Sequence, residues 1–566
     1  MSSIHDPLKP TTLREALSSL HAKQWLEAIQ DKLKSLLQNE TWRSVHRSSA
    51  NSSHKVLKGK WVFKIKRGPK GEILRYKARW VVKGYKQQYG INYDQTFAAV
   101  VKPMAFRTLF ALAAYHDLEI DQMDVKTAFL NGQIIEDVYV EHPHGFGKSG
   151  EVCCLLKGLY GLKQSPRMWY KVIHDFLVSL GFQKLQADHS VFMTKNSPFT
   201  SANGLIVSVY VDDIKIIGSR AAVDSLKQQF CSKFEMTDLG PISYYLGMTV
   251  TRNRKLKTIT IQQRSYLKRV LQTFHYWDNE HDKPLLNPVK TPMDEKDQHL
   301  KPFDGQALKD DIKTYQSQVG SLMYAIIETR PDLAFAVSQV SQFSHNPGPQ
   351  HFTAIKRIFR YIAGTLDYGI NYGGNHQDLT LVGYSDASYG DNITNRRSSS
   401  GYIFMLGGRP ITWSSKRQTT VALSTTESEY MGLTQAAKEA LWLKLLLTEL
   451  QQIDQPYVDV KVRKDNSAAD SVLNATESIT IYGDNKSSIA LAQNPEFHQR
   501  TKHIDIQHHF IRDEVTAKCI KLTFVNTRDM VADALTKPLG PIKFDRFLTL
   551  TGLRSAKGQR GGSTLG

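Results

Sequence analysis

The feature that most limits how this chain can fold is a pair of adjacent aspartates between two apolar runs. Residues 205–211 are mostly apolar and β-branched, Asp212 and Asp213 follow directly, and residues 214–218 resume the strand pattern. This pattern predicts two buried strands joined by a tight hairpin, with both acids at its tip. Two like charges held this close repel each other or shift their pKa values unless a cation lies between them. A solvated turn is the alternative, and the motif alone favours it.

A third acid ends another strand, 88 residues before Asp212. Residues 118–125 alternate between polar and apolar positions, Asp124 stands near their end, and a turn follows. Mg²⁺ binds one or two carboxylates together with substrate phosphates, so three carboxylates at strand ends could meet around divalent metal. Two metal ions at such a site activate an attacking hydroxyl and stabilise the leaving oxygen in phosphoryl transfer.

The net charge makes nucleic acid the first partner to consider. The 566 residues include 73 Lys and Arg against 54 Asp and Glu, a formal charge of +19. A basic surface attracts polyanions and releases their counterions, although ribosomal, chromatin and membrane-surface proteins are also basic. No apolar run approaches the roughly 18 residues of a membrane span, so no membrane partner is expected. The four cysteines form no C-x-x-C pair and are expected to be reduced thiols.

Basic residues concentrate in one segment near the N-terminus. Residues 55–86 contain twelve Lys or Arg and one acid, Glu72, interleaved with aromatic side chains. Residues 60–66 alternate at period two and a turn at 68–71 follows, which predicts a basic hairpin. A solvated strand face is the alternative, but the aromatic residues favour contact with nucleic acid or a nucleotide.

An apolar stripe at helical spacing runs through residues 12–38. Thr12, followed three residues later by Glu15, predicts a capping box where this helix begins. The stretch is therefore expected to form a helical lead-in to the basic hairpin.

Four further acids stand at the ends of predicted elements in the C-terminal half: Asp386, Glu429, Asp484 and Asp533. Any one of them alone would be interpreted as a surface charge. Glu429 has a close neighbour, Glu427, which is explained as a capping-box residue three positions after Ser424. For Glu429 itself, a solvated first-turn glutamate that favours the helix dipole is the alternative.

Five longer motifs occur in order along the first half of the chain. They are Tyr76-Lys-Ala-Arg79, Tyr93-Asp-Gln-Thr-Phe97, Met123-Asp-Val-Lys-Thr-Ala-Phe-Leu-Asn-Gly132, Leu159-Tyr-Gly-Leu-Lys-Gln-Ser-Pro-Arg167 and Tyr210-Val-Asp-Asp213. The first two resemble the fingers, and the other three the palm, of copia-type reverse transcriptases. The chain thus resembles the reverse transcriptase and ribonuclease H portion of a copia-type retrotransposon Pol polyprotein.

The resemblance implies a role for the acids of the first half. Asp124, Asp212 and Asp213 would hold two Mg²⁺ ions, with Mn²⁺ as the alternative metal. The primer 3′-hydroxyl would attack the α-phosphate of an incoming deoxynucleoside triphosphate there.

The resemblance also implies a nucleotide-binding site. Phe129 matches the residue that blocks a ribose 2′-hydroxyl, and Arg79 and Gln164 match positions that contact the nucleotide. A core aromatic, a solvated arginine and a surface amide are the respective alternatives. Residues 246–248 match the strand that grips the primer.

In the C-terminal half the order of the acids resembles a ribonuclease H site. Asp386, Glu429, Asp484 and Asp533 would bind two Mg²⁺ ions and cut the RNA strand of an RNA–DNA hybrid by water attack. The stretch 501–512 also matches the family and is expected to contact the hybrid or pack as a helix, with a zinc site at its histidines as the alternative.

Two departures from the family pattern affect this second site. The tryptophan that the family usually shows near Asp386 is absent, because residues 387–389 read Ala-Ser-Tyr. An extra segment of unassigned role, 455–478, contains Asp465, which competes with Asp484 as the strand-end acid. Asp484 is preferred because the following family motifs lie at the expected distance from it.

The expected fold class is α+β: a right-hand polymerase with fingers, a ferredoxin-like palm and a thumb, followed by a ribonuclease H-like mixed-sheet domain. The expected divisions are an N-terminal helical lead-in, fingers and palm, thumb and connection, ribonuclease H-like domain and disordered tail, at 1–54, 55–250, 251–375, 376–554 and 555–566.

The expected function is RNA-directed DNA polymerase with coupled ribonuclease H cleavage. Its partners would be an RNA template, a DNA primer, an RNA–DNA hybrid and deoxynucleoside triphosphates. The expected location is intracellular, in a cytoplasmic virus-like particle or the nucleus, and the oligomeric state is left open. A catalytically inactive nucleic-acid-binding remnant is the alternative, and a basic structural protein would leave the ordered acids unexplained.

Overall fold

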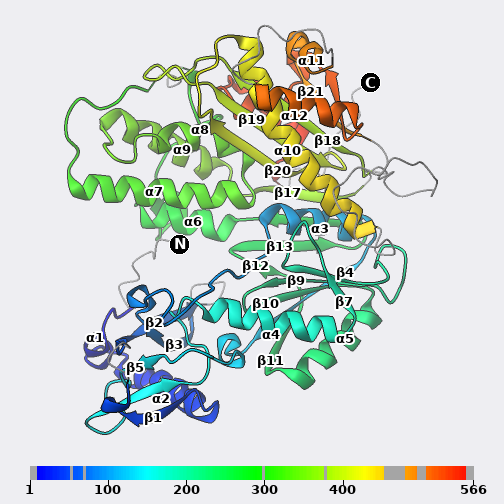
Figure 1. The fold of residues 1–566 in the computed structure, drawn as a ribbon. Coiled ribbons are helices and arrows are strands. Elements are labelled where there is room, and N and C mark those ends of the chain that lie inside the picture. The colour runs from blue at the N-terminus through cyan, green and yellow to red at the C-terminus, as the bar shows by residue number, and fades with distance from the viewer. Residues whose placement is uncertain are drawn as a thin grey trace.

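The structure, a computed structural model, describes residues 9–50, 55–67, 72–295, 300–374, 379–451, 478–493 and 505–555. The expected turn at 68–71, the extra segment except its last residue, and the tail beyond 555 lie outside these ranges. Among the described residues, no helix is both long and apolar enough to cross a bilayer. In Figure 1 the elements of the first half of the chain lie below those of the second half.

The N-terminal stretch forms two helices, α1 (Leu13–Leu17) and α2 (Ala22–Gln38). Thr12 caps α1, because its Oγ1 accepts from the Glu15 N–H at 3.2 Å, whereas the Glu15 carboxylate accepts from the Thr11 N–H at 2.8 Å, one residue before the expected partner. The expected helical lead-in is thus made of two helices. Leu20, between the helices, is fully exposed and supplies no apolar contact that would hold a longer helix in place.

The expected basic hairpin is confirmed by the antiparallel pairing of β2 (Gly59–Arg67) with β3 (Ile73–Val82). Helix α2 packs on it through Trp25, whose ring meets those of Phe63 and Tyr76 edge-on at 5.1 and 4.8 Å between centroids. A three-stranded sheet lies nearby, made of β1 (Trp42–His46), β6 (Glu151–Leu155) and β5 (Tyr139–Val140).

A six-stranded antiparallel sheet forms the expected palm. Its strands, in spatial order, are β11 (Met236–Pro241), β4 (Glu119–Val125), β10 (Asp213–Gly218), β9 (Leu205–Tyr210), β8 (Val191–Thr194) and β7 (Phe182–Lys184). The helices around it are α3 (Pro103–Tyr115), α4 (Ser165–Ser179) and α5 (Arg220–Lys233). Ile206 packs in the same core as α3, whereas Val207 packs in the same core as α4 and α5. Burial on both faces explains why the sequence of β9 is apolar at most positions.

The region from 251 to 375 contains the expected helices and also a sheet that the sequence patterns did not predict. The helices are α6 (Arg264–Thr273), α7 (Lys309–Glu328), α8 (Ala334–Ser341) and α9 (Pro349–Gly364). The strands, in spatial order, are β12 (Tyr244–Tyr245), β13 (Met248–Asn253), β14 (Thr258–Gln262), β17 (Tyr368–Gly373) and β23 (Arg554–Ser555). The division expected at 250 therefore falls inside β13.

A second five-stranded sheet, with both parallel and antiparallel pairs, follows. Its strands, in spatial order, are β20 (Arg409–Arg417), β19 (Ser399–Leu406), β18 (Leu381–Ser388), β21 (Ile479–Gly483) and β22 (Ile520–Phe524). The elements around it are α10 (Thr425–Gln451), α11 (Lys486–Gln493), α12 (Asp505–Thr516), the short 3-10 helix η9 (Val531–Leu535) and α13 (Pro541–Thr551). The expected α+β class with a mixed sheet after the palm is confirmed.

Candidate active sites

Antiparallel pairing brings the three expected palm acids to one corner of the sheet. Asp213 in β10 stands directly opposite Asp124 in β4. The β9–β10 hairpin turns through Val211 and Asp212, and Val211 adopts a left-handed φ of 58°. The Val125 N–H donates to the Asp212 carbonyl at 2.8 Å, which ties the hairpin tip to β4. Acids 88 residues apart in sequence are thus neighbours in the fold.

A buried lysine lies beneath Asp213. Because side chains alternate along a strand, Lys215 shares a face of β10 with Asp213, and its Nζ lies 3.3 Å from Asp213 Oδ2. The ammonium also lies 3.2 Å from the centre of the Tyr245 ring, and Gln122 Nε2 donates to Asp213 Oδ1 at 2.9 Å. Burial lowers the pKa of Lys215 to about 7, although Asp213 opposes that shift. Sequence reasoning missed Lys215, for which the available signal was one lysine in an otherwise apolar strand.

Two of the three residues expected at the nucleotide lie around one tyrosine. The ring of Phe129 meets Tyr160 edge-on at 4.7 Å, and the Arg79 guanidinium lies 5.4 Å from the centre of the Tyr160 ring. Burial raises the pKa of Tyr160, and the charge of Asp212 adds to this shift. Tyr160 thus connects Arg79 and Phe129 to the acidic corner.

The third expected nucleotide residue, Gln164, is engaged inside the protein. Its Oε1 accepts from Gln87 Nε2 at 2.9 Å, and its Nε2 donates to the Asn92 carbonyl at 2.8 Å. Only 2% of the Gln164 surface is exposed, so the alternative of a surface amide was wrong. Its contact with a nucleotide stays a prediction.

The segment expected to grip the primer forms the turn between β12 and β13. Leu246 and Gly247 both have positive φ angles, 43° and 80°. The Tyr324 hydroxyl donates to the Leu246 carbonyl and holds this turn against α7. The structure thus places a constrained turn at 246–247, and its role with a primer stays a prediction.

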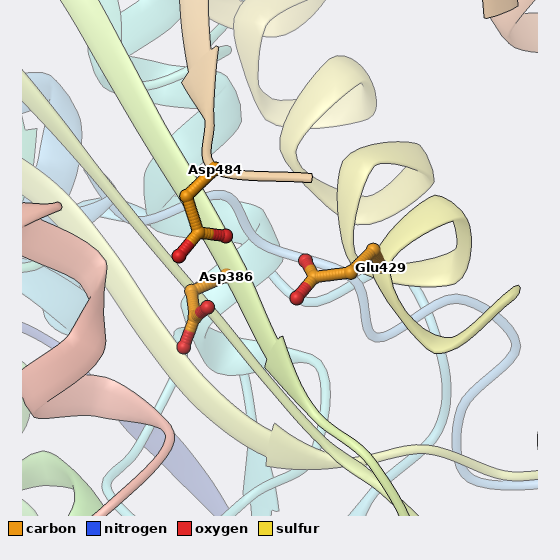
Figure 2. A group of neighbouring side chains, drawn as sticks. All are labelled: Asp386, Glu429 and Asp484. Carbon is orange, nitrogen blue, oxygen red and sulfur yellow. The ribbon is translucent and has the colours of Figure 1, made fainter. Parts of the chain in front are cut away.

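The second carboxylate site gathers three acids from three elements. Asp386 lies in β18, Glu429 in the first turns of α10, and Asp484 directly after β21. Figure 2 shows the three side chains pointing toward one another, and each offers an oxygen within 4.8 Å of the others. The parallel pairing of β18 with β21 brings Asp386 and Asp484 to the same end of the sheet.

The fourth expected acid, Asp533 in η9, joins this site through a lysine that sequence reasoning did not single out. Lys537 Nζ lies 2.8 Å from Asp533 Oδ1 and 3.8 Å from Asp386 Oδ2. The Thr536 hydroxyl donates to Asp386 Oδ2 as well. The short helix η9 and the two residues after it therefore place an acid, a hydroxyl and an ammonium group around Asp386.

Burial and repulsion between acids raise the pKa values of Asp386, Glu429 and Asp533. Burial, followed by the charge of Asp386, raises the pKa of Glu429 to about 10. The same two causes raise the pKa of Asp533 to about 6. Burial also raises the pKa of Asp386, against the opposing effect of Lys537. A cation bound among these groups would remove the repulsion that holds their protons.

Two neighbouring features bear on the remaining expectations. Ser424 caps α10, since its Oγ accepts from the Glu427 N–H at 3.2 Å, and the Glu427 carboxylate turns back to accept from the Leu423 N–H at 2.7 Å. The histidine-containing stretch lies partly outside the description, which omits residues 501–504 and the side chains of 505–508.

Both carboxylate sites offer donors that suit a divalent metal, and among the described residues the second one brings three acids within 4.8 Å of one another. Their candidate ligands are carboxylate oxygens, the donors that Mg²⁺ and Mn²⁺ prefer. Oxygens bound to one Mg²⁺ at about 2.1 Å lie at most roughly 4 Å apart, so the second site needs only a small closure. The acids of each site also attract a positive charge, since each site holds a lysine ammonium group beside an aspartate. These lysines are Lys215 in the palm and Lys537 in the second site.

Comparisons with known proteins identify the family of this chain. Residues 39–293 match the family described as reverse transcriptase (RNA-dependent DNA polymerase). The chain is 39% identical over 563 residues to the retrovirus-related Pol polyprotein from transposon TNT 1-94 of Nicotiana tabacum, and 35% identical over 549 residues to that from transposon RE1 of Arabidopsis thaliana. A transposon Ty5-1 protein of Saccharomyces cerevisiae is 32% identical over 327 residues, which cover all of that protein and 56% of this chain. The chain belongs to the copia-type retrotransposon Pol family.

The matches cover 98% and 95% of this chain but only 39% and 34% of the tobacco and Arabidopsis relatives. Among solved structures, a foamy viral protease-reverse transcriptase in complex with RNA/DNA hybrid is similar, with a TM-score of 0.44 and 14% identity. That similarity covers 88% of this chain and 53% of the viral one. The family expected from the sequence motifs is confirmed.

Proposed function

We propose that this Pol chain copies RNA into DNA at the palm and cuts the RNA strand of the resulting hybrid at the second carboxylate site. The gathering of Asp386, Glu429 and Asp484 at one site, and the register pairing of Asp213 with Asp124, carry this proposal in a chain of the reverse transcriptase family. Each cluster has the donors that two-metal phosphoryl transfer requires. Bound Mg²⁺, or Mn²⁺, would activate the attacking oxygen and stabilise the leaving oxygen at each site.

At the palm, the chain's own residues orient the groups around the reaction. Lys215 and Gln122 fix the Asp213 carboxylate from below, so that Asp213 and Asp124 face the substrate as a preformed pair. The primer 3′-oxygen forms a bond to the α-phosphate, and the bond from that phosphate to pyrophosphate breaks. Phe129 presents its ring where a ribose 2′-hydroxyl would have to fit, and Arg79 offers a guanidinium to the triphosphate.

At the second site, a water molecule attacks the RNA phosphate, and the bond to the 3′-oxygen of the preceding nucleotide breaks. The Thr536 hydroxyl fixes Asp386, and the Thr527 hydroxyl donates to Asp484 Oδ2 at 3.0 Å. Burial and the charge of Asp386 raise the pKa of Glu429, and a bound cation would favour its ionised form.

The proposed partners are an RNA template, a DNA primer, deoxynucleoside triphosphates and the RNA–DNA hybrid. The formal charge of +19 and the basic β2–β3 hairpin, which carries Arg79, support binding to these polyanions. We place this work inside the cell, in a cytoplasmic virus-like particle or the nucleus. Fractionation of expressing cells, followed by detection of the chain, tests that placement.

Primer extension on an RNA template tests the whole proposal. In Mg²⁺ the chain should give long DNA products together with RNA fragments, and EDTA should abolish both. Asp124→Asn should stop extension while hybrid binding, measured by fluorescence anisotropy, persists. The matched control Asp224→Asn changes an exposed acid on α5 and should leave extension intact. A folded wild-type chain that binds hybrid but neither extends nor cuts would be a silent remnant, and the proposal would be wrong.

A further inference from the structure

Helix α10 reaches from the second carboxylate site to the palm. Glu429 lies in its first turns, and Trp442 follows 13 residues later, about 20 Å further along the helix axis. Glu449 lies about two turns beyond Trp442. In Figure 1 this helix, drawn in yellow, descends from the upper half of the molecule to the palm helix α3. One continuous helix therefore carries a candidate catalytic acid at one end and a palm contact at the other.

We call Trp442 and Glu449 the clamp, because both contact one palm loop, the connection between β7 and β8. Trp442 Nε1 donates to the Ala187 carbonyl at 2.8 Å. The Glu449 carboxylate accepts from the backbone N–H groups of Gln186 and Ala187 at 2.7 and 2.9 Å. Lys102, just before α3, donates to the same Ala187 carbonyl at 3.1 Å, and its ammonium lies 4.6 Å from the centre of the Trp442 ring. The clamp thus binds backbone groups that have a fixed place in the palm.

The clamped loop leads directly into the hairpin that carries the polymerase acids. Its last residue, Ser190, accepts through its carbonyl from the Val209 N–H at 2.9 Å. The next residues form β8, which pairs with β9, and β9 runs into the turn that holds Asp212. The clamp therefore attaches α10 to the same sheet that carries the polymerase acids.

A second attachment lies on the other side of the same interface. Arg107 of α3 is buried, and its Nε donates to the Ile411 carbonyl in β20 at 2.6 Å. Its guanidinium lies 4.1 Å from the centre of the Trp413 ring. Two attachments, at β20 and at α10, hinder the rotation that a single one would leave free.

We propose that α10 is a spacer that fixes the distance between the polymerase and hybrid-cutting sites, with Trp442 and Glu449 as its positioning residues. The inference rests on the proposed function, because it concerns where one site acts relative to the other. It specifies that the clamp determines how far behind the primer 3′-end the RNA is cut. Neither residue touches the reacting atoms, so the clamp sets the position of the cut and leaves the rate of the chemistry at each site unchanged.

The test compares cut positions on a hybrid whose DNA strand ends in a recessed 3′-terminus. The double variant Trp442→Phe/Glu449→Gln keeps an aromatic ring at position 442 and a side chain of the same length at position 449. It removes the indole N–H donor and the carboxylate charge. The matched control is Glu439→Gln in the same helix. Glu439 is also half-buried and also accepts two hydrogen bonds, but its donors are Thr412 of β20 and Tyr402 of β19, outside the palm. A second, short hybrid that cannot reach the palm reports the cutting rate alone.

For wild type and the control, cuts should cluster at one distance from the primer end. In the clamp variant the fraction at that position should fall at least about twofold, while the rates of extension and of cutting the short hybrid stay within about twofold. Unchanged positions in the clamp variant, or equal spreading in Glu439→Gln, would overturn the spacer. A wild-type chain that does not cut even the short hybrid would instead refute the proposed function, and the spacer with it.

Native cysteines give a readout that needs no activity. Cys231 on α5 is exposed, and Cys519, between α12 and β22, is half-buried, whereas the other two cysteines are buried. Spin labels at these two positions should give a narrow distance distribution in wild type and a broad one in the clamp variant. A narrow distribution in the clamp variant would overturn the spacer even if the cut positions spread.

Discussion

The two carboxylate sites accommodate like charges in different ways. In the palm, Asp124, Asp212 and Asp213 stay half-exposed at a hairpin tip, and the cation nearest to them is a buried lysine. In the second site Asp386 is only 2% exposed, and burial raises the pKa values of Asp386, Glu429 and Asp533. The palm acids lie at a hairpin tip, whereas Asp386 lies inside a sheet that is packed on by other elements. The two sites thus differ in how deeply their acids are buried.

The strongest test of this separation is Asp212→Asn. Loss of one negative ligand from the palm should lower primer extension by more than about a thousandfold, because two-metal chemistry depends on the full carboxylate set. Cutting of a preformed hybrid should stay within about twofold, since Asp212 lies in a different sheet from Asp386. Single-turnover extension and cutting assays measure both. Asp175→Asn, at an exposed acid of α4, is the control, and an equal loss in both assays would mean that the sites are not separate.

The reciprocal change, Asp386→Asn, should give a somewhat smaller loss. Hybrid cutting should fall between about a hundredfold and a thousandfold, because three other acids of the site remain. Extension should persist. Asp529→Asn, at an exposed acid that pairs with Arg546, should alter neither activity. Cutting that survives Asp386→Asn would show that the second cluster is not the nuclease site.

Phe129→Val tests the nucleotide pocket, which belongs to the palm alone. A smaller side chain leaves room for a ribose 2′-hydroxyl, so the preference for deoxynucleotides over ribonucleotides should fall about a hundredfold. The ratio of kcat/KM values for the two substrates measures this. Phe176→Val, in α4 against Phe230, should lower stability but leave that preference unchanged. If the preference for deoxynucleotides survives Phe129→Val, Phe129 is an ordinary core aromatic and does not select the sugar.

The smallest effect is expected for a change of stability at Glu328, which lies where the palm helix α3 meets β20. Burial raises the pKa of Glu328 to about 7, and the Glu328 carbonyl accepts from the same Arg107 that bonds to β20. Between its ordinary pKa and about 7, the folded state keeps a proton that the unfolded state has lost, so stability falls as pH rises through this window. Glu328→Gln should therefore stabilise the chain by about 2 kcal/mol at pH 8 and have little effect near pH 4.

Chemical denaturation at both pH values measures this difference. Glu235→Gln, at an exposed acid paired with Lys126, should show almost none of it. A Glu328→Gln variant that is no more stable than wild type at pH 8 would show that the buried carboxylate is not costly there.

Local sequence patterns were sufficient for the parts of each site that lie within one element. The apolar runs around Asp212 predicted a hairpin with acids at its tip, and the structure has that hairpin. The position of Glu427 relative to Ser424 predicted a cap, which left Glu429 free for the second site. Both patterns work because a turn or a cap depends on a few consecutive residues.

Other features could not be read from such patterns. The sheet that contains β13 and β14 was not predicted, and neither was the break between α1 and α2. Gln164 matched a motif, yet its amide is engaged between Gln87 and Asn92, which lie more than seventy residues earlier. Burial and hydrogen-bond partners of this kind come from segments that a local window does not contain.

The sequence by itself determined which acids stand at the ends of strands and helices, in what order, and in which family of chains. Only the tertiary structure decided that Asp213 stands opposite Asp124, that Lys215 lies buried beneath them, and that Lys537 approaches Asp386 and Asp533. The physical reason is range. Periodicity, capping and turns are set by neighbours within a few residues, whereas strand register and the charge around a carboxylate are set by packing among segments far apart in the chain.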